Sequence, residues 1–133
     1  MELFKSFFVV ITISNDKQVI TNDWFLTTET MSDEQYKADM LKFAELAKIY
    51  KPKYHLIKSV NFKYTIAIEM QDWTNNTIFP QLIEAGIKKI AFLVSSAMIA
   101  QLSIEQTLDE SNADAFIVKY FDPEIDANNW LLD

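Results

Sequence analysis

The feature that most constrains the fold is an apolar run in the second half of the chain, residues 87–94. Apart from Lys88 and Lys89 every residue in it is apolar, and the only glycine of the chain, Gly86, comes directly before it. A run this short and this apolar is typical of a β-strand that is covered on both faces. Such strands occur mainly in parallel sheets with helices packed on them. We therefore expect an α/β domain in which this segment is a central parallel strand.

Four further segments have the composition of strands. Residues 6–13 and 19–24 are rich in β-branched and aromatic side chains, and the turn-forming stretch 15–17 separates them, which predicts a hairpin. No Asn-Gly pair is present, so the turn type stays open. Residues 54–60 and 115–121 follow as two more strands, which makes five in all.

The first expected helix has a clear start and a clear end. Ser32 is a favourable N-cap residue, and Gln35 three residues later completes a capping box. Lys51 and Pro52 predict the end of the helix. Between them runs an apolar stripe at helical spacing, formed by Tyr36, Met40, Phe43, Ala44 and Ala47.

The segment 65–85 allows two interpretations. It has helical composition near both ends, but the weak stretch 74–77 and Pro80 interrupt it. The sequence therefore predicts either one kinked helix or two short helices. Gly86 stands just past the end, where a left-handed C-cap residue is expected.

Another helix is expected between the last two strands. Ser95 or Ser96 would cap its start, and residues 103–106 form a second capping box, which indicates that this helix restarts midway. The chain then closes with a helix for which Asp122 is the N-cap and Pro123 the first helical residue. The side chains expected to dock this last helix are Ile125, Trp130 and Leu131.

The complete order is ββαβαβαβα. Helices between successive strands imply parallel pairing with right-handed crossovers, and the opening hairpin makes the five-stranded sheet mixed. The length fits a single domain over residues 1–133, and no Gly/Ser/Pro-rich linker divides it.

Composition excludes several functions. The chain has no cysteine, which rules out disulfides and thiol nucleophiles, and one glycine cannot build a phosphate loop. All twelve basic residues are lysine and the net charge is −7, so we expect no nucleic-acid binding.

No apolar run approaches the roughly 20 residues that span a bilayer, and no signal-peptide pattern opens the sequence. We expect a cytoplasmic protein without an integral membrane segment.

The only histidine, His55, lies inside the expected strand 54–60. We interpret it as a satisfied or half-exposed strand residue, because no Ser-His-Asp arrangement can be built around it. The acidic residues lack the spacing and the glycine of a calcium loop, so no metal and no other cofactor is expected. Pairs such as Glu69 and Asp72 are assigned to a helix surface, although a carboxylate-only hydrolase would use such a pair.

Lysines concentrate between residues 37 and 63, where seven of them stand against two acids. We interpret them as residues at a helix C-terminus and on an exposed strand face. The alternative is a surface for a second copy of the chain, or for an acidic partner that docks near Lys51 and Lys53.

Several stretches together resemble the SpoIIAA-like group of STAS domains. They are 31–37 (Met-Ser-Asp-Glu-Gln-Tyr-Lys), 69–73 (Glu-Met-Gln-Asp-Trp), 86–92 (Gly-Ile-Lys-Lys-Ile-Ala-Phe) and the closing stretch 120–131. The resemblance covers about residues 5–132. It implies helices mainly on one face of a five-stranded sheet and a non-enzymatic regulatory or protein-interaction role, with a protein partner or a homodimer. Related CRAL-TRIO folds bind lipids in a cavity, so a carrier of a lipid or other small apolar ligand is the alternative.

One departure from this family affects function. Anti-sigma antagonists carry a phosphorylatable serine in an Asp-Ser-Ser-like motif just after the third strand, at a helix N-terminus. Here residues 57–65 read Ile-Lys-Ser-Val-Asn-Phe-Lys-Tyr-Thr, so the motif is absent. No catalytic, cofactor-binding or metal-binding residue is predicted. The remaining candidates for an interaction are Lys51, Lys53, Lys58, Ser59 and Thr65.

Overall fold

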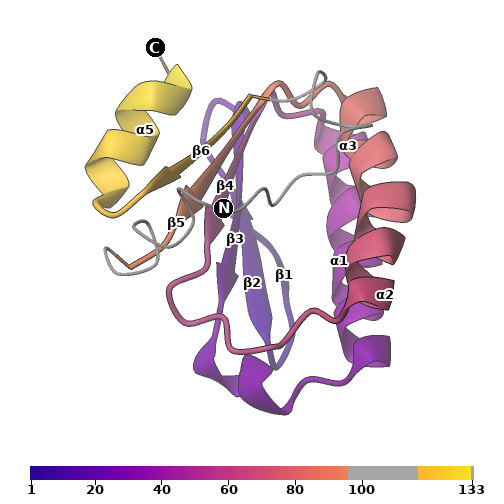
Figure 1. Ribbon diagram of the computed structural model, residues 1–133. Coiled ribbons are helices and arrows are strands. Elements are labelled where there is room, and N and C mark those ends of the chain that lie inside the picture. The colour runs from indigo at the N-terminus through magenta and orange to yellow at the C-terminus, as the bar shows by residue number, and fades with distance from the viewer. Residues whose placement is uncertain (96–116, 133) are drawn as a thin grey trace.

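A computed structural model describes residues 1–95 and 117–132 and shows one mixed β-sheet with helices on both faces (Figure 1). Its six strands lie side by side in chain order: β1 (Glu2–Lys5), β2 (Val9–Ile13), β3 (Val19–Trp24), β4 (Tyr54–Lys58), β5 (Lys89–Leu93) and β6 (Ile117–Phe121). The pairs β1–β2 and β2–β3 are antiparallel, and the strands from β3 to β6 run parallel. The predicted α/β class is confirmed. The central parallel strand is confirmed as β5, because it has a parallel neighbour on each side.

The prediction of five strands in the order ββαβαβαβα is wrong, because β1 precedes the expected hairpin. The strand predicted to start at Ser6 begins only at Val9. Ser6 causes this break: its amide donates to the carbonyl of Val9 at 2.8 Å, and its hydroxyl accepts from the amide of Phe8 at 3.0 Å. These bonds close a turn that folds β1 back onto β2.

Helix α1 (Asp33–Tyr50) begins and ends where the sequence predicts. The amide of Gln35 donates to the Ser32 hydroxyl at 3.1 Å, and the amide of Ser32 donates to the Gln35 side chain at 2.9 Å, which confirms the capping box. At the other end Lys51 adopts a left-handed conformation, with φ of 52°. The left-handed residue stops the helix just before Pro52.

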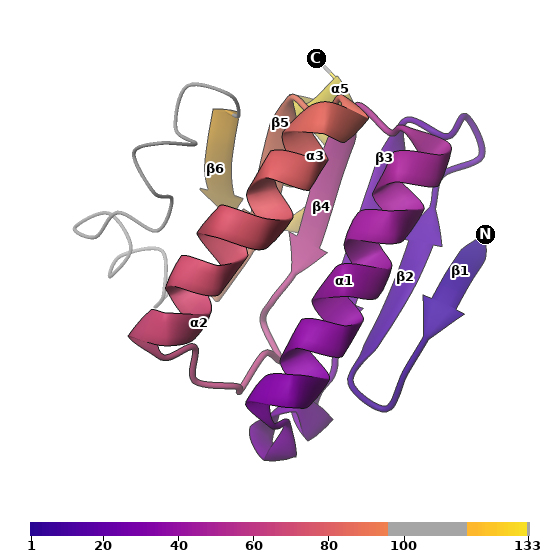
Figure 2. The ribbon, with the colours of Figure 1, turned by 90° about the vertical axis from the view of Figure 1, so that its right-hand side faces the viewer.

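The segment with two interpretations is one continuous helix in three parts: α2 (Ile68–Trp73), the π-helical stretch η2 (Thr74–Ile78) and α3 (Phe79–Ala85) (Figure 2). The π stretch coincides with the weak residues 74–77 and ends just before Pro80. Proline lacks an amide and crowds the carbonyl four residues earlier, and the wider π turn accommodates both effects. Gly86 has φ of 100°, so its predicted left-handed C-cap is confirmed.

The helices form two layers. Helix α1 and the continuous α2–α3 helix lie on one face of the sheet, and α5 (Glu124–Leu132) lies on the other, against β5 and β6 (Figures 1 and 2). Ala127 and Leu131 of α5 are fully buried, and the ring of Trp130 packs 5.6 Å from that of Phe121. Ile125 is 67% exposed, so its predicted docking role is wrong.

The helix expected after Ser95 or Ser96, with its second capping box at 103–106, lies outside the described residues. A 3-10 turn, η1 (Leu26–Thr30), joins β3 to α1. Within residues 1–95 and 117–132, no helix is long and apolar enough to cross a membrane.

Candidate ligand-binding cavity

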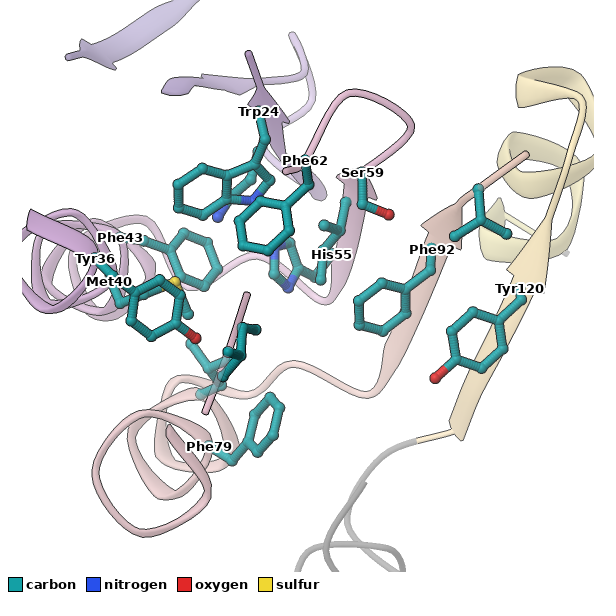
Figure 3. A pocket seen from close by; sticks show the side chains of 15 residues that line it. Trp24, Tyr36, Met40, Phe43, His55, Ser59, Phe62, Phe79, Phe92 and Tyr120 are labelled. Atoms are coloured by element: carbon teal, nitrogen blue, oxygen red, sulfur yellow. The ribbon is translucent and has the colours of Figure 1, made fainter. Parts of the chain in front are cut away.

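A cavity of about 320 Å³ lies between the sheet and the helices α1 and α3 (Figure 3). Its walls are mainly apolar and aromatic. The described residues that line it are Asn22, Trp24, Tyr36, Met40, Phe43, His55, Ile57, Ser59, Phe62, Ile66, Phe79, Leu82, Phe92, Val94 and Tyr120. None of them is an acid or a lysine.

The parallel strands supply one wall of the cavity. Alternate residues of a strand face the same side of the sheet, and paired residues on neighbouring strands face it together. The register places Asn22 opposite Ile57, Ile57 opposite Phe92, and Phe92 opposite Tyr120. These four residues therefore form one row across four strands. His55 lies two residues before Ile57, in the adjacent row of the same face.

The helices supply the facing wall. Tyr36, Met40 and Phe43 of α1 line it, and they belong to the apolar stripe that the sequence predicts. Phe79 and Leu82 of α3 complete it beside them. Because Tyr36 and Phe43 are also buried in the main hydrophobic cluster, this wall is continuous with the core.

The segment between β4 and α2 adds Phe62 and Ile66 to the cavity wall. Tyr64 holds this segment in place. Its ring stacks on Tyr36 with 4.9 Å between the ring centroids, and its hydroxyl donates to the carboxylate of Asp33. Desolvation of the phenol and, after it, the hydrogen bond to the Asp33 carboxylate raise the pKa of Tyr64, so the hydroxyl stays protonated as a donor.

His55 is the least expected member of the cavity wall. It is only 2% exposed, and neither ring nitrogen has a hydrogen-bond partner among the described residues. Its ring stacks on Phe43 at 4.4 Å and lies among the rings of Phe43, Phe62 and Phe92 (Figure 3). Burial lowers the pKa of His55 to about 3. The expectation of a satisfied or half-exposed histidine is therefore wrong, because α1 covers it and offers the Phe43 ring in place of a polar partner.

A neutral imidazole at pH 7 has one nitrogen that donates and one that accepts. His55 thus presents hydrogen-bonding capacity to the cavity without a charge. Either ring nitrogen can carry the proton, because no neighbour in the described part of the chain forms a hydrogen bond that would select one tautomer.

Two more polar groups of the cavity wall have no partner among the described residues. Asn22 is 2% exposed, and its side-chain oxygen has no hydrogen-bond partner within the described ranges. The buried hydroxyl of Tyr120 has none either, and burial raises the pKa of this phenol to about 12. Its ring stacks on Phe92 at 5.1 Å. A buried polar group without a partner costs about 1–3 kcal/mol, so three of them in one cavity call for an explanation.

The lysine candidates from the sequence lie away from this cavity. Lys51 and Lys53 are exposed and lie just before the start of β4. Lys58, at the other end of that strand, forms an ion pair of 3.2 Å with Glu124 on the face that α5 covers. The three lysines do not come together in one site.

The hydroxyl candidates also lie apart. Ser59 lines the cavity, but its hydroxyl donates to the carbonyl of Leu93 at 2.8 Å. Thr65 is exposed in the segment before α2. That helix begins at Ile68, so Ser59 does not stand at a helix N-terminus as the family's phosphorylated serine does. The described residues contain no group of three or more His, Asp or Glu side chains that could hold a metal.

Comparison of the chain with family models, with curated proteins and with solved structures gave no match. The resemblance to SpoIIAA-like domains therefore stays a prediction.

The sequence interpretation missed Asn22 and Tyr120 and misjudged His55. One signal could have found two of them: Asn22 and His55 fall at positions of their strands that otherwise face the core, beside Ile20, Trp24 and Ile57.

Proposed function

We propose that this chain is a non-enzymatic module that binds one small, predominantly apolar ligand in the cavity. The observation that carries the proposal is a cavity of about 320 Å³ with aromatic walls, in which three buried polar groups have no described partner. Ligand cavities have volumes of roughly 300–1,000 Å³ and combine apolar walls with a few polar groups that orient the ligand. The cavity lies at the small end of that range.

A single ordered water cannot satisfy all three polar groups. Asn22 and Tyr120 lie three strands apart in one row, which corresponds to about 14 Å between their Cα atoms. A buried water needs two to four polar partners within hydrogen-bond distance. One water cannot reach both residues, whereas one elongated ligand can. Binding is favoured over turnover because His55, with a pKa of about 3, is a poor general base at neutral pH.

Titration with the neutral fluorescent probe N-phenyl-1-naphthylamine tests the proposal. We expect saturable binding with one site per chain. Ile57→Trp, which places an indole in the cavity, should weaken binding at least about tenfold, a change that corresponds to roughly 1.4 kcal/mol. Leu41→Trp is the matched control, because Leu41 lies on the outer side of α1 and is 46% exposed.

Circular dichroism spectra of both variants establish that they are folded. Native mass spectrometry of freshly purified protein provides a second measurement, in which a persistent added mass supports a carrier. A folded wild-type chain that binds no probe and carries no added mass would contradict the proposal.

A regulatory or protein-interaction role is the second candidate. Phe7 and Leu26 are 69% and 59% exposed, and the Thr27 hydroxyl donates to the Phe7 carbonyl at 2.6 Å, so the two segments are adjacent. Adjacent exposed apolar side chains favour a protein partner or a homodimer. Light scattering of the purified chain tests the homodimer: a dimer that Phe7→Ser with Leu26→Ser converts to a monomer supports it, and a monomeric wild type contradicts it.

A further inference from the structure

We infer that the ligand is an uncharged, flat ring compound whose hydroxyl group is bound between Asn22 and His55. This inference rests on the proposed function and adds the chemical class of the ligand. It depends on three features of the cavity: where the unpartnered polar groups lie, which charges the wall lacks, and what shape its side chains have.

The two polar groups are close enough to bind one hydroxyl. His55 pairs in register with Ile20, and Asn22 follows two residues later on the same strand. One strand spacing and two residues along the strand place the Cα atoms of Asn22 and His55 about 8 Å apart, on the same face of the sheet. Side chains of this length can converge on one group placed between them.

A hydroxyl matches the hydrogen-bonding capacity of this pair. It can donate its proton to the unpartnered side-chain oxygen of Asn22 and accept the ring N–H of the neutral His55. A group that only accepts would leave the Asn22 oxygen unpaired, and a purely apolar ligand would leave both residues unpaired. Each unpaired buried group costs about 1–3 kcal/mol. The cavity should therefore bind a ligand with a hydroxyl at this point more tightly than a ligand without one.

The wall excludes a charged ligand. No acid, lysine or arginine is among the described residues that line the cavity, and its histidine and tyrosines are neutral at pH 7. An ion transferred from water into such a space loses its hydration without gaining a counter-ion. The ligand is therefore neutral at physiological pH.

The wall also selects a flat molecule. The rings of Trp24, Phe43, Phe62, Phe92 and Tyr120 surround the space from both sides (Figure 3). Aromatic side chains stack on other rings with centroid distances of about 4.5–7 Å. The distance from Asn22 to Tyr120 accommodates roughly two or three rings, with the Tyr120 hydroxyl at the far end.

Three compounds that share one naphthalene ring test the inference: 2-naphthol, 2-methylnaphthalene and 2-naphthoate. Each is used to displace N-phenyl-1-naphthylamine from the wild-type chain at pH 7. We expect 2-naphthol to bind about tenfold more tightly than 2-methylnaphthalene, which has the same shape without the hydroxyl. We expect 2-naphthoate, which is charged, to displace no probe.

Substitutions at Asn22 and His55 test whether these two residues cause the preference for 2-naphthol. Asn22→Leu and His55→Phe should each reduce the tenfold preference for 2-naphthol to about onefold while 2-methylnaphthalene still binds. Thr21→Val is the matched control, because Thr21 is the neighbour of Asn22 on the opposite face of β3, and it should keep the full preference. The ligand series on the wild-type chain decides the inference even if a variant fails to fold.

The outcomes separate the two proposals. Probe binding with equal displacement by 2-naphthol and 2-methylnaphthalene, or with displacement by 2-naphthoate, overturns the inference and leaves the proposed function standing. Failure of the folded wild-type chain to bind the probe or any of the three compounds overturns both.

Discussion

Two regions on the same face of the sheet differ in whether their buried polar groups are hydrogen-bonded. Between α1 and the strands β1 and β2, the buried Asp39 accepts a hydrogen bond of 2.7 Å from the hydroxyl of Ser6. Around the cavity, the polar groups of Asn22, His55 and Tyr120 have no partner in the described part of the chain. We call the first the packed region and the second the cavity region.

This difference in hydrogen bonding shows which part of the fold contains destabilising buried polar groups. Buried polar groups are nearly always hydrogen-bonded in native proteins, and an unsatisfied one costs about 1–3 kcal/mol. In the packed region the cost of burying the Asp39 carboxylate is offset by the hydrogen bond from Ser6. In the cavity region the unpaired polar groups all line the space that a ligand could occupy, and a ligand could form the missing hydrogen bonds. This pattern is expected of a binding site rather than of a poorly packed core.

The largest expected effect compares two isoleucines. Ile11 of the packed region is 0% exposed, and Ile57 of the cavity wall is half-buried. We expect Ile11→Ala to lower the free energy of unfolding by about 4 kcal/mol, because the deletion leaves a new void in a full core. Ile57→Ala should lower it by only about 1–2 kcal/mol, since its side chain already borders open space and loses fewer contacts. Urea denaturation of both variants measures the difference.

Equal losses for the two variants would break the comparison. They would mean that the surroundings of Ile57 are packed as tightly as those of Ile11, and that no cavity exists in solution. The substitution is chemically the same at both sites, so the comparison is internally controlled.

The second prediction uses pH to probe the cavity region. Burial lowers the pKa of His55 to about 3 in the folded state, against an ordinary value of 6.5 in the unfolded chain. Between these values the unfolded state binds more protons, so stability is complete above pH 6.5 and falls as the pH decreases. We expect a loss of roughly 1 kcal/mol per pH unit between pH 6 and pH 5, measured by urea denaturation.

His55 is the only histidine in the chain, and a variant that lacks it separates its effect from that of the carboxyl groups. His55→Phe should abolish the slope between pH 6 and pH 5 and leave the protein at least as stable at pH 7. A wild-type chain whose stability is flat over this interval would show that His55 is solvated or hydrogen-bonded, contrary to the cavity region as described.

The sequence predicts the local parts of this fold well. The capping box at Ser32, the left-handed Gly86 and the apolar run that becomes β5 depend on neighbours within a few residues, and all three are confirmed. Strand β1 escaped prediction because its side chains show little alternation, and its existence depends on pairing with β2 across the Ser6 turn. The residue composition of a segment does not indicate whether it pairs with a neighbouring strand in this way.

The cavity was predictable only in part. Strand alternation places Asn22 and His55 on the core-facing side, which the sequence alone could have indicated. It could not indicate that β3, β4, β5 and β6 pair in a register that brings Tyr120 into the same row as Asn22. Nor could it indicate that Phe43 of α1 would cover His55 with a ring rather than with a hydrogen-bonding group.

The smallest expected effect compares two tyrosines and sharpens the comparison to a single hydroxyl. The hydroxyl of Tyr36 forms a hydrogen bond of 2.8 Å with the hydroxyl of Thr74, which itself donates to the carbonyl of Met70. The buried hydroxyl of Tyr120 has no partner in residues 1–95 and 117–132. The change Tyr→Phe removes one oxygen in each case, so only the surroundings of that oxygen differ.

We expect Tyr36→Phe to lower the free energy of unfolding by about 1 kcal/mol, the net contribution of one hydrogen bond. Tyr120→Phe should raise it by about 0.5 kcal/mol, because an unpaired hydroxyl leaves a buried site while the ring keeps its stacking on Phe92. Urea denaturation at one pH, with both variants and the wild type in parallel, resolves the two signs. If Tyr120→Phe instead destabilises the chain as much as Tyr36→Phe does, the Tyr120 hydroxyl has a partner in the folded protein. The far end of the cavity is then satisfied by the chain itself, and only Asn22 and His55 are left to orient a ligand.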